Sequence, residues 1–261
     1  HVTAKYAMEM AIEKASKQGM AIVGIVQTNH IGRLGEYAEL AASEDMIGLV
    51  WAGGYSEQKP MAVPFGGRKP VLHTNPLAMG FPSGDEPTIV LDFATTAIAG
   101  SKVLLAQQGG KPIPPDSILD RCGNPTTDPA AFQDGGMQLP FGAHKGYAIM
   151  LAVELLSRVL IGTGQYANPS RGGVVMRDQG VSMMAIKADL FQPLEEFKSY
   201  TDEIEQRIRS VPPAPGFDEV IVPGDPEARN RTARLRDGIP ITDEIWTALV
   251  ETAGSLGVDV G

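Results

Sequence analysis

The chain has little of what marks a disulfide-bonded, metal-binding, membrane or nucleic-acid protein. Its 261 residues include a single cysteine, Cys122, which excludes an internal disulfide framework and a cysteine-rich metal site. The longest strongly apolar segment, residues 148–156, is too short to span a membrane. Lysine and arginine number 22 against 31 aspartates and glutamates, and this net charge of −9 argues against nucleic acid or an anionic membrane as the main partner. We therefore expect a soluble, cytoplasmic protein without a metal.

Several common catalytic motifs are also missing. The sequence has no G-x-G-x-x-G after a strand, no P-loop, no H-E-x-x-H and no G-x-S-x-G. A conventional Rossmann enzyme, a nucleotide triphosphatase, a zinc hydrolase and an α/β-hydrolase therefore gain no support. The chain begins at His1 in helical sequence with no signal-peptide pattern, which suggests processing or preceding residues.

What is present is a globular composition, 43% hydrophobic and 20% charged, with enough residues for a sizeable core. Hydrophobic periodicity predicts alternating helices and strands in the first fifty residues. A long loop is expected from Gly109 to Gly142, followed by an apolar and therefore buried helix. The expected helices are 3–18, 35–45, 101–108, 145–161, 194–211, 225–236 and one opening at Thr242; the expected strands are 21–27, 47–52, 89–94, 174–176 and 181–186, with strand-like islands at 61–63 and 70–72.

His30 is the most informative residue. It lies in a glycine-punctuated turn between the apolar run 21–26 and the helical stretch 37–42. Such turns carry reactive groups in many α/β proteins, and an imidazole suits proton exchange near neutral pH. The alternative is a hydrogen-bonded loop or core histidine.

Two further segments offer polar groups beside glycines or strand ends. Residues 64–70 contain two adjacent glycines and lead to Thr74 and Asn75, which are suited to hydrogen-bonding a ligand, although a purely structural turn is equally consistent. Asp92 ends an apolar strand, where a carboxylate can orient an imidazole or hold a ribose hydroxyl. Helix capping is the alternative for Asp92.

The start of the helix at residue 145 is the fourth candidate. Helix N-termini attract anions, and Lys145 followed by Gly146 adds a full positive charge there. Because a cation is electrostatically unfavourable at that end of a helix, its presence favours an anionic ligand such as a dinucleotide phosphate over an ordinary solvated lysine.

Taken together, these segments resemble the type 2 malate/L-lactate dehydrogenase family, which includes ureidoglycolate, sulfolactate and diketogulonate dehydrogenases and cyclic imino-acid reductases. The matching segments occur in the family's order and extend over essentially the whole chain. They are residues 29–32, 63–67, 74–76, 90–92 with 94–96, 139–142 with 145–146, and 223–225.

The resemblance implies NAD- or NADP-dependent interconversion of a small 2-hydroxy acid and its 2-keto acid, or reduction of a related imine. It implies an α/β (α+β), non-Rossmann fold in which a mostly antiparallel sheet binds the cofactor beside an α/β domain, usually in a homodimer. We accordingly expect a cofactor-binding domain at 61–199 and a substrate and dimer domain formed by 1–60 with 200–261.

The resemblance also suggests residue roles. His30 would exchange the proton and Asp92 would hold the catalytic charge network, while Arg33, Thr74 and Asn75 would bind substrate. The expected cofactor contacts are Ile89, Val90, Leu91, Asp92, Phe93, Ala94, Thr95, Lys145, Gly146, Pro223, Gly224 and Asp225.

The chain departs from the family pattern in three places. It lacks the upstream Ser-His-Gly segment to which several branches assign the proton donor, and we expect that this segment precedes His1. His73 replaces a common glycine, and Asp225 replaces a common glutamate. The competing hypothesis is therefore a catalytically impaired relative that serves as a binding or regulatory protein. A hydrolase built on His30 and Asp92 has no supporting motif.

Overall fold

The computed structural model describes residues 1–54, 59–163 and 179–259, and the chain divides into two compact units, His1–Pro223 and Gly224–Gly261. The first unit contains a five-stranded sheet in the order β1-β8-β2-β3-β4, and every strand pair in it is antiparallel. Its strands are β1 (Met20–Val26), β2 (Met46–Gly53), β3 (Leu77–Phe81), β4 (Ile89–Phe93) and β8 (Gly180–Lys187). This confirms the mixed helix and antiparallel-sheet prediction.

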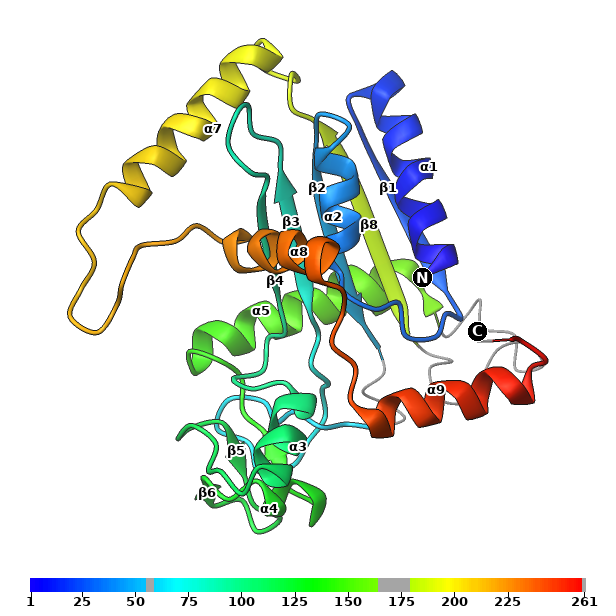
Figure 1. Ribbon diagram of the computed structural model, residues 1–261, viewed down its shortest axis with the longest axis vertical. Helices are drawn as coiled ribbons and strands as arrows, with labels where there is room; N and C mark the ends of the chain where they lie inside the picture. Colours follow the sequence, from blue (N-terminus) through cyan, green and yellow to red (C-terminus); the bar gives the residue numbers. More distant parts are fainter. Residues whose placement is uncertain (55–58, 164–178, 260–261) are drawn as a thin grey trace. The chain divides into compact units, whose positions relative to one another are not determined.

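Helices cover both faces of this sheet (Figure 1). Helices α1 (Val2–Gln18) and α2 (Gly35–Ala42) bury small side chains such as Ala11 and Ala38 on one face. On the other face, Val153 of α5 (His144–Glu154) packs against Trp51 and Leu77. This layering leaves the turn that precedes α2 at one end of the sheet, beside the end of β2.

Two glycines let α2 lie very close to the sheet. Gly48 of β2 and Gly80 of β3 are directly paired, and a Cβ on either would lie within 2.8 Å of the carbonyl oxygen of Ala38. Real Cβ atoms do not approach backbone that closely, so a side chain at either position would push the helix away. The pair of glycines therefore fixes the height of α2 and of the turn that leads into it.

The predicted long loop at 109–142 is wrong in part, because it contains a second sheet. This three-stranded sheet has the order β6-β5-β7 and is antiparallel. Along the chain, α4 (Ala130–Gln133) lies between β6 and β7. Its strands are only two residues long, too short for an alternating pattern to reveal them: β5 (Ile118–Leu119), β6 (Pro125–Thr126) and β7 (Met137–Gln138). α3 (Gly100–Gln108) precedes it, close to the predicted helix.

The helix predicted at 145–161 differs in burial. It forms α5 and continues as the π-helical turn η2 (Leu155–Val159), but only one side packs against the sheet. Within the described residues, apolar side chains on its other side are 38–60% exposed, including Leu151, Leu155, Leu156, Val159 and Leu160. The prediction of a buried helix is wrong there, since periodicity cannot tell a core face from a surface-exposed apolar face.

The remaining elements are mostly where the periodicity placed them. The islands at 61–63 and 70–72 meet in a single antiparallel bridge between Ala62 and Leu72, while β3 was not predicted. The strand expected at 174–176 lies outside the described residues. The first unit also holds α7 (Leu194–Arg209); the second holds α8 (Asp225–Asp237) and α9 (Asp243–Ser255), and the predicted cap at Thr242 accepts a hydrogen bond from Ile245 N–H at 3.4 Å.

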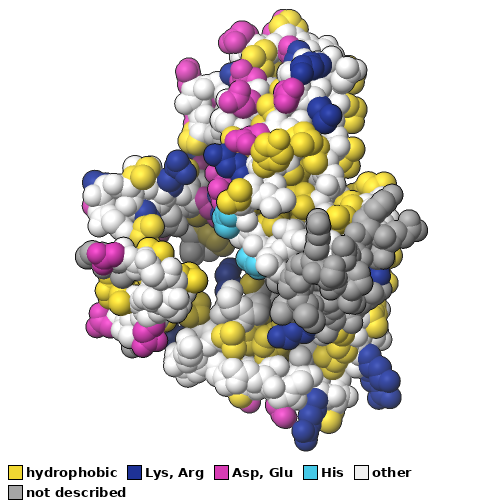
Figure 2. All heavy atoms as spheres, turned by 90° about the vertical axis from the view of Figure 1, so that its right-hand side faces the viewer, with side chains coloured by type: hydrophobic (Ala, Val, Ile, Leu, Met, Phe, Trp, Pro, Cys, Tyr) yellow, Lys and Arg dark blue, Asp and Glu magenta, His cyan; other side chains and the backbone are white. Residues whose placement is uncertain are grey.

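The predicted division into residues 61–199 and 1–60 with 200–261 stays a prediction. The five-stranded sheet draws β1 and β2 from one range and the other three strands from the other. No helix in the described residues is long and apolar enough to cross the lipid bilayer. On the face shown in Figure 2, lysine and arginine side chains are scattered among acidic ones.

Candidate active site

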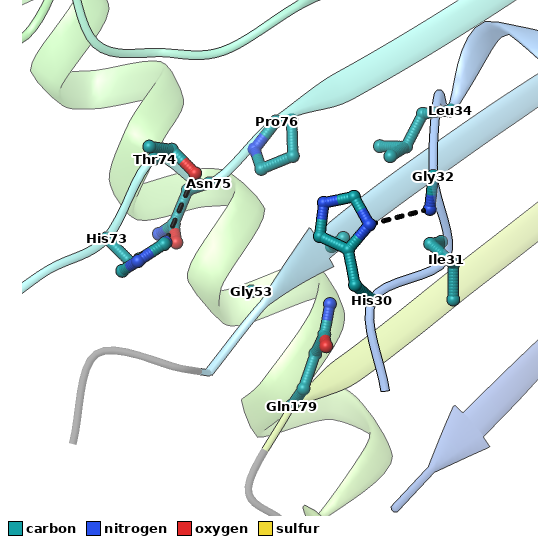
Figure 3. A pocket seen from close by; sticks show the side chains of 11 residues that line it. His30, Ile31, Gly32, Leu34, Gly53, His73, Thr74, Asn75, Pro76 and Gln179 are labelled. Atoms are coloured by element: carbon teal, nitrogen blue, oxygen red, sulfur yellow. Dashed lines mark hydrogen bonds between the residues drawn. The ribbon is translucent and has the colours of Figure 1, made fainter. Parts of the chain in front are cut away.

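A cavity of about 120 Å³ lies where the turn before α2 meets the ends of β2 and β8 and the turn before β3. His30 stands on one side and His73, Thr74 and Asn75 on the other (Figure 3). Three of the predicted site residues, His30, Thr74 and Asn75, are therefore brought together although more than forty positions separate them. The lining consists of His30, Ile31, Gly32, Leu34, Ala52, Gly53, His73, Thr74, Asn75, Pro76 and Gln179.

The His30 turn is fixed by hydrogen bonds from several directions. The Gly35 N–H donates to an Asp92 carboxylate oxygen at 2.7 Å, and the buried Tyr37 hydroxyl donates to the Ile31 carbonyl. The Gly32 N–H donates to Nδ1 of His30 at 3.1 Å. Since Nδ1 accepts this bond, the neutral imidazole carries its hydrogen on Nε2, and that tautomer is inferred from the hydrogen bond.

Asp92 acts on the turn and not on the cavity surface. Its carboxylate accepts the Gly35 N–H at the first residue of α2, and the Arg33 Nε lies 3.7 Å from the same oxygen. The carboxylate thus fits the helix-capping alternative, since it accepts the first N–H of α2, and its predicted catalytic role stays a prediction. Arg33 also forms a 2.7 Å ion pair with Glu39 and is not among the residues that line the cavity.

The opposite wall is held by a buried polar network. Asn75, 1% exposed and in the left-handed region with φ of 35°, donates from its side-chain amide to the Met150 carbonyl and to Glu154, both at 3.0 Å. The Glu154 carboxylate also accepts from the Gly54 N–H at 3.1 Å. The Thr95 hydroxyl lies within hydrogen-bond distance of two carbonyls of the same turn, 2.9 Å from that of Thr74 and 3.1 Å from that of Asn75. The turn that presents Thr74 to the cavity is thereby locked from both sides.

Glu154 was not predicted from the sequence. A lone carboxylate inside the apolar stretch 148–156 was an available signal, because a buried acid is kept only where it has partners. Its partners lie 79 and 100 positions away, so their identity was not accessible without the fold.

The predicted cofactor residues form a neighbouring group. An antiparallel bridge pairs Thr96 with Pro140, and the Phe141 N–H donates to the Thr95 carbonyl at 3.0 Å. The end of β4 therefore lies beside the turn that opens α5, and Phe93 meets Phe141 edge to face at 5.6 Å. Pro223 joins this group, since its carbonyl accepts the Val90 N–H at 3.0 Å. Gly224 and Asp225 belong to the second unit, where Gly224 has φ of 106° at the N-cap of α8.

The N-terminus of α5 offers backbone N–H groups and a lysine, which are groups that bind phosphate. Its N-cap, Ala143, has no side chain that could cap the first N–H groups, and Lys145 is exposed there. Gly146 is required by packing, because a Cβ at this position would lie 1.8 Å from the Phe141 carbonyl oxygen. An uncapped helix N-terminus with a nearby cation is suited to a dinucleotide pyrophosphate. Lys145 does not line the cavity that His30 lines. Among the described residues, no group of three histidine, cysteine or acidic side chains could hold a metal ion.

Comparisons with known proteins define the class. The malate/L-lactate dehydrogenase family model matches residues 1–250. L-sulfolactate dehydrogenase of Methanothermobacter thermautotrophicus is 38% identical, over 100% of this chain and 73% of its own length. Ureidoglycolate dehydrogenase (NAD+) of Escherichia coli K12 is 34% identical, over 97% of this chain and 71% of its own. Relatives of this kind confirm the general oxidoreductase interpretation.

Solved structures of similar proteins point to the same family. Sulfolactate dehydrogenase from Methanocaldococcus jannaschii superposes with a TM-score of 0.85 at 38% identity, covering 99% of this chain and 73% of that one. The delta1-piperideine-2-carboxylate reductase from Pseudomonas syringae gives 0.80 at 31% identity, covering 94% and 72%. The chain belongs to the malate/L-lactate dehydrogenase family, as its scattered motifs predicted.

Proposed function

We propose that the protein is an NAD- or NADP-dependent oxidoreductase that interconverts a small 2-hydroxy acid and the corresponding 2-keto acid, or reduces a related cyclic imine. The names of its relatives support the hydroxy-acid chemistry and the nicotinamide cofactor. The single observation that carries the proposal is the small cavity in which His30 faces Thr74 and Asn75, beside the group formed by β4 and the opening of α5.

Within this proposal the cofactor residues of the first unit are those around β4 and the opening of α5. The segment 89–95, with Lys145, Gly146 and Pro223, would hold the dinucleotide, with the phosphates at the N-terminus of α5. The cofactor roles of Gly224 and Asp225, in the second unit, stay predictions. When bound, the nicotinamide supplies or accepts the hydride, and the protein provides position and a route for the proton.

His30 handles the substrate oxygen. In the inferred tautomer Nε2–H is a donor, so it fits the carbonyl oxygen of a 2-keto acid and would polarise that bond. To receive the hydroxyl proton in the oxidative direction, Nε2 must be free and Nδ1 must carry hydrogen. Proton transfer at Nε2 therefore requires the Gly32 N–H to leave Nδ1, which water can compensate because His30 is exposed.

The other side chains bind and orient. Thr74 and Asn75 would position the substrate, and Arg33 would reach its carboxylate once released from Glu39. Asp92 keeps the His30 turn in place through the Gly35 N–H. We further propose a cytoplasmic homodimer, to which the exposed apolar side of α5 and η2 is suited, with residues 61–199 as the cofactor domain.

The test is direct. Purified protein is mixed with NADH or NADPH and with pyruvate, oxaloacetate or a cyclic 2-imino acid, and the loss of reduced-nicotinamide absorbance is followed. Consumption that depends on the acid is expected. If the folded protein is inert across the panel but binds nucleotide in a titration, the impaired, regulatory alternative is correct and the enzymatic proposal is wrong.

A further inference from the structure

The wall of the cavity opposite His30 carries a second imidazole, and apolar side chains line the cavity on the side of the His30 turn. His73 lines it next to Thr74, and its Nδ1 lies 3.1 Å from the Thr74 hydroxyl oxygen (Figure 3). The remaining side chains of the lining include Ile31, Leu34 and Ala52, which are 2%, 5% and 3% exposed. Within the described lining, the polar contribution comes from neutral groups and the two histidines.

His73 is uncharged at neutral pH. Burial, reinforced by the positive charge of Lys59, lowers the pKa of His73 to about 4. At pH 7 about one molecule in a thousand therefore carries a proton on this ring. The imidazole thus presents a compact, desolvated and neutral surface to whatever occupies the cavity.

These properties discriminate among 2-keto acids. Every candidate substrate brings one carboxylate next to the reacting carbon, and the candidates differ in the group at the far end of the side chain. A second anion placed against buried apolar carbons and a neutral ring loses its water, and no lysine or arginine stands among the described lining residues to pair with it; Lys59 acts on His73 from outside the lining.

We propose that His73 makes this cavity selective for 2-keto acids with a small, uncharged side chain, against those that carry a second carboxylate or sulfonate. The inference rests on the proposed function, since it assigns the substrate class of the same site. It separates this protein from its sulfolactate dehydrogenase relatives, whose named substrate is a dianion.

The test uses two acids that differ only at the far end. 2-Oxobutyrate and oxaloacetate differ by a methyl group in place of a carboxylate, so the ratio of their kcat/KM values reports charge together with size. The neutral 4-methyl-2-oxopentanoate, which matches oxaloacetate in shape, separates the two: it should also be preferred over oxaloacetate if charge decides. We expect 2-oxobutyrate to be preferred by about 100-fold, in the range that single side-chain groups produce in enzyme pockets. A parent protein that prefers oxaloacetate would overturn the proposal.

Variants of His73 attribute the preference to this side chain. His73→Arg places a permanent cation in the wall and should move the ratio at least about tenfold toward oxaloacetate. His73→Asn is smaller and neutral, and should improve turnover of the longer 2-oxovalerate by about tenfold without helping oxaloacetate. Val71→Ala, at a position 58% exposed and outside the lining, is the matched control and should leave every ratio at the parent value.

The outcomes separate the two proposals. If the parent turns over 2-oxobutyrate but both variants keep the parent's ratios of kcat/KM, His73 does not set specificity. If the arginine variant does not fold, the turnover of 2-oxovalerate by the asparagine variant tests the role of His73 in its place. If the parent turns over none of the acids, the proposed function fails, and calorimetric titration of the same two acids with oxidised cofactor decides the selectivity. Tighter binding of 2-oxobutyrate then supports the inference, and equal or reversed binding overturns it.

Discussion

The neutral His73 makes the stability of the protein depend on pH in a way that can be calculated. Its pKa in the folded protein is about 4, against about 6.5 for an unperturbed histidine in the unfolded chain. Between these values the unfolded state binds a proton that the folded state does not, so the contribution of His73 to stability is complete above pH 6.5 and is lost as the pH falls toward 4. Linkage of one such group gives a loss of about 1.4 kcal/mol at pH 5.5 and less than about 0.1 kcal/mol at pH 7.5.

The comparison of parent and His73→Asn isolates this effect from the many carboxylates that titrate in the same range. Urea unfolding of both proteins at pH 7.5 and 5.5 gives, for each protein, the change in its free energy of unfolding between the two pH values. We expect the parent to lose about 1.3 kcal/mol more than the variant between these pH values. If the difference between the two proteins stays constant, the imidazole is not held neutral by burial, and the reasoning about the cavity wall is refuted.

Two further variants test the supports of the cavity. Asp92→Ala should cost about 1–2 kcal/mol in urea unfolding, because it removes the acceptor of the Gly35 N–H, whereas Asp92→Asn keeps an oxygen there and should cost less; equal stability of the parent and the alanine variant would contradict the capping role. Glu154→Leu leaves the Gly54 N–H and one of the two Asn75 amide hydrogens without an acceptor and should cost about 3 kcal/mol or more, while Glu154→Gln should recover part of it. A leucine variant as stable as the glutamine variant would show that this network does not hold the wall.

Much of the fold could be predicted where the local pattern is long. The apolar runs at β1 and β8 and the periodicity of α1, α2 and α7 fixed these elements to within a few residues. β3 escaped because its five residues are mostly buried on both sides and lie in a glycine- and proline-rich stretch. The two-residue strands of the small sheet carry no periodicity at all.

The candidate site was predictable in its parts and not in its assembly. The glycine-bearing turns around His30 and Thr74 could be recognised from the sequence as candidate site segments, and the structure brings them together in one cavity. Asp92 contacts the turn that carries His30, and Lys145 opens a helix in the neighbouring group; neither is among the residues that line the cavity. Which side a strand-end carboxylate faces depends on pairing between distant segments, and the sequence does not contain that geometry.

The measurement that bears most directly on the account is the turnover of His30→Ala. His30 is exposed at the cavity rim, so its removal should leave folding and nucleotide binding intact. If the imidazole handles the substrate oxygen, kcat for reduction of 2-oxobutyrate should fall by about 100- to 10,000-fold, with the dissociation constant of the cofactor unchanged. A variant that turns over the acid at the parent rate would contradict the central claim.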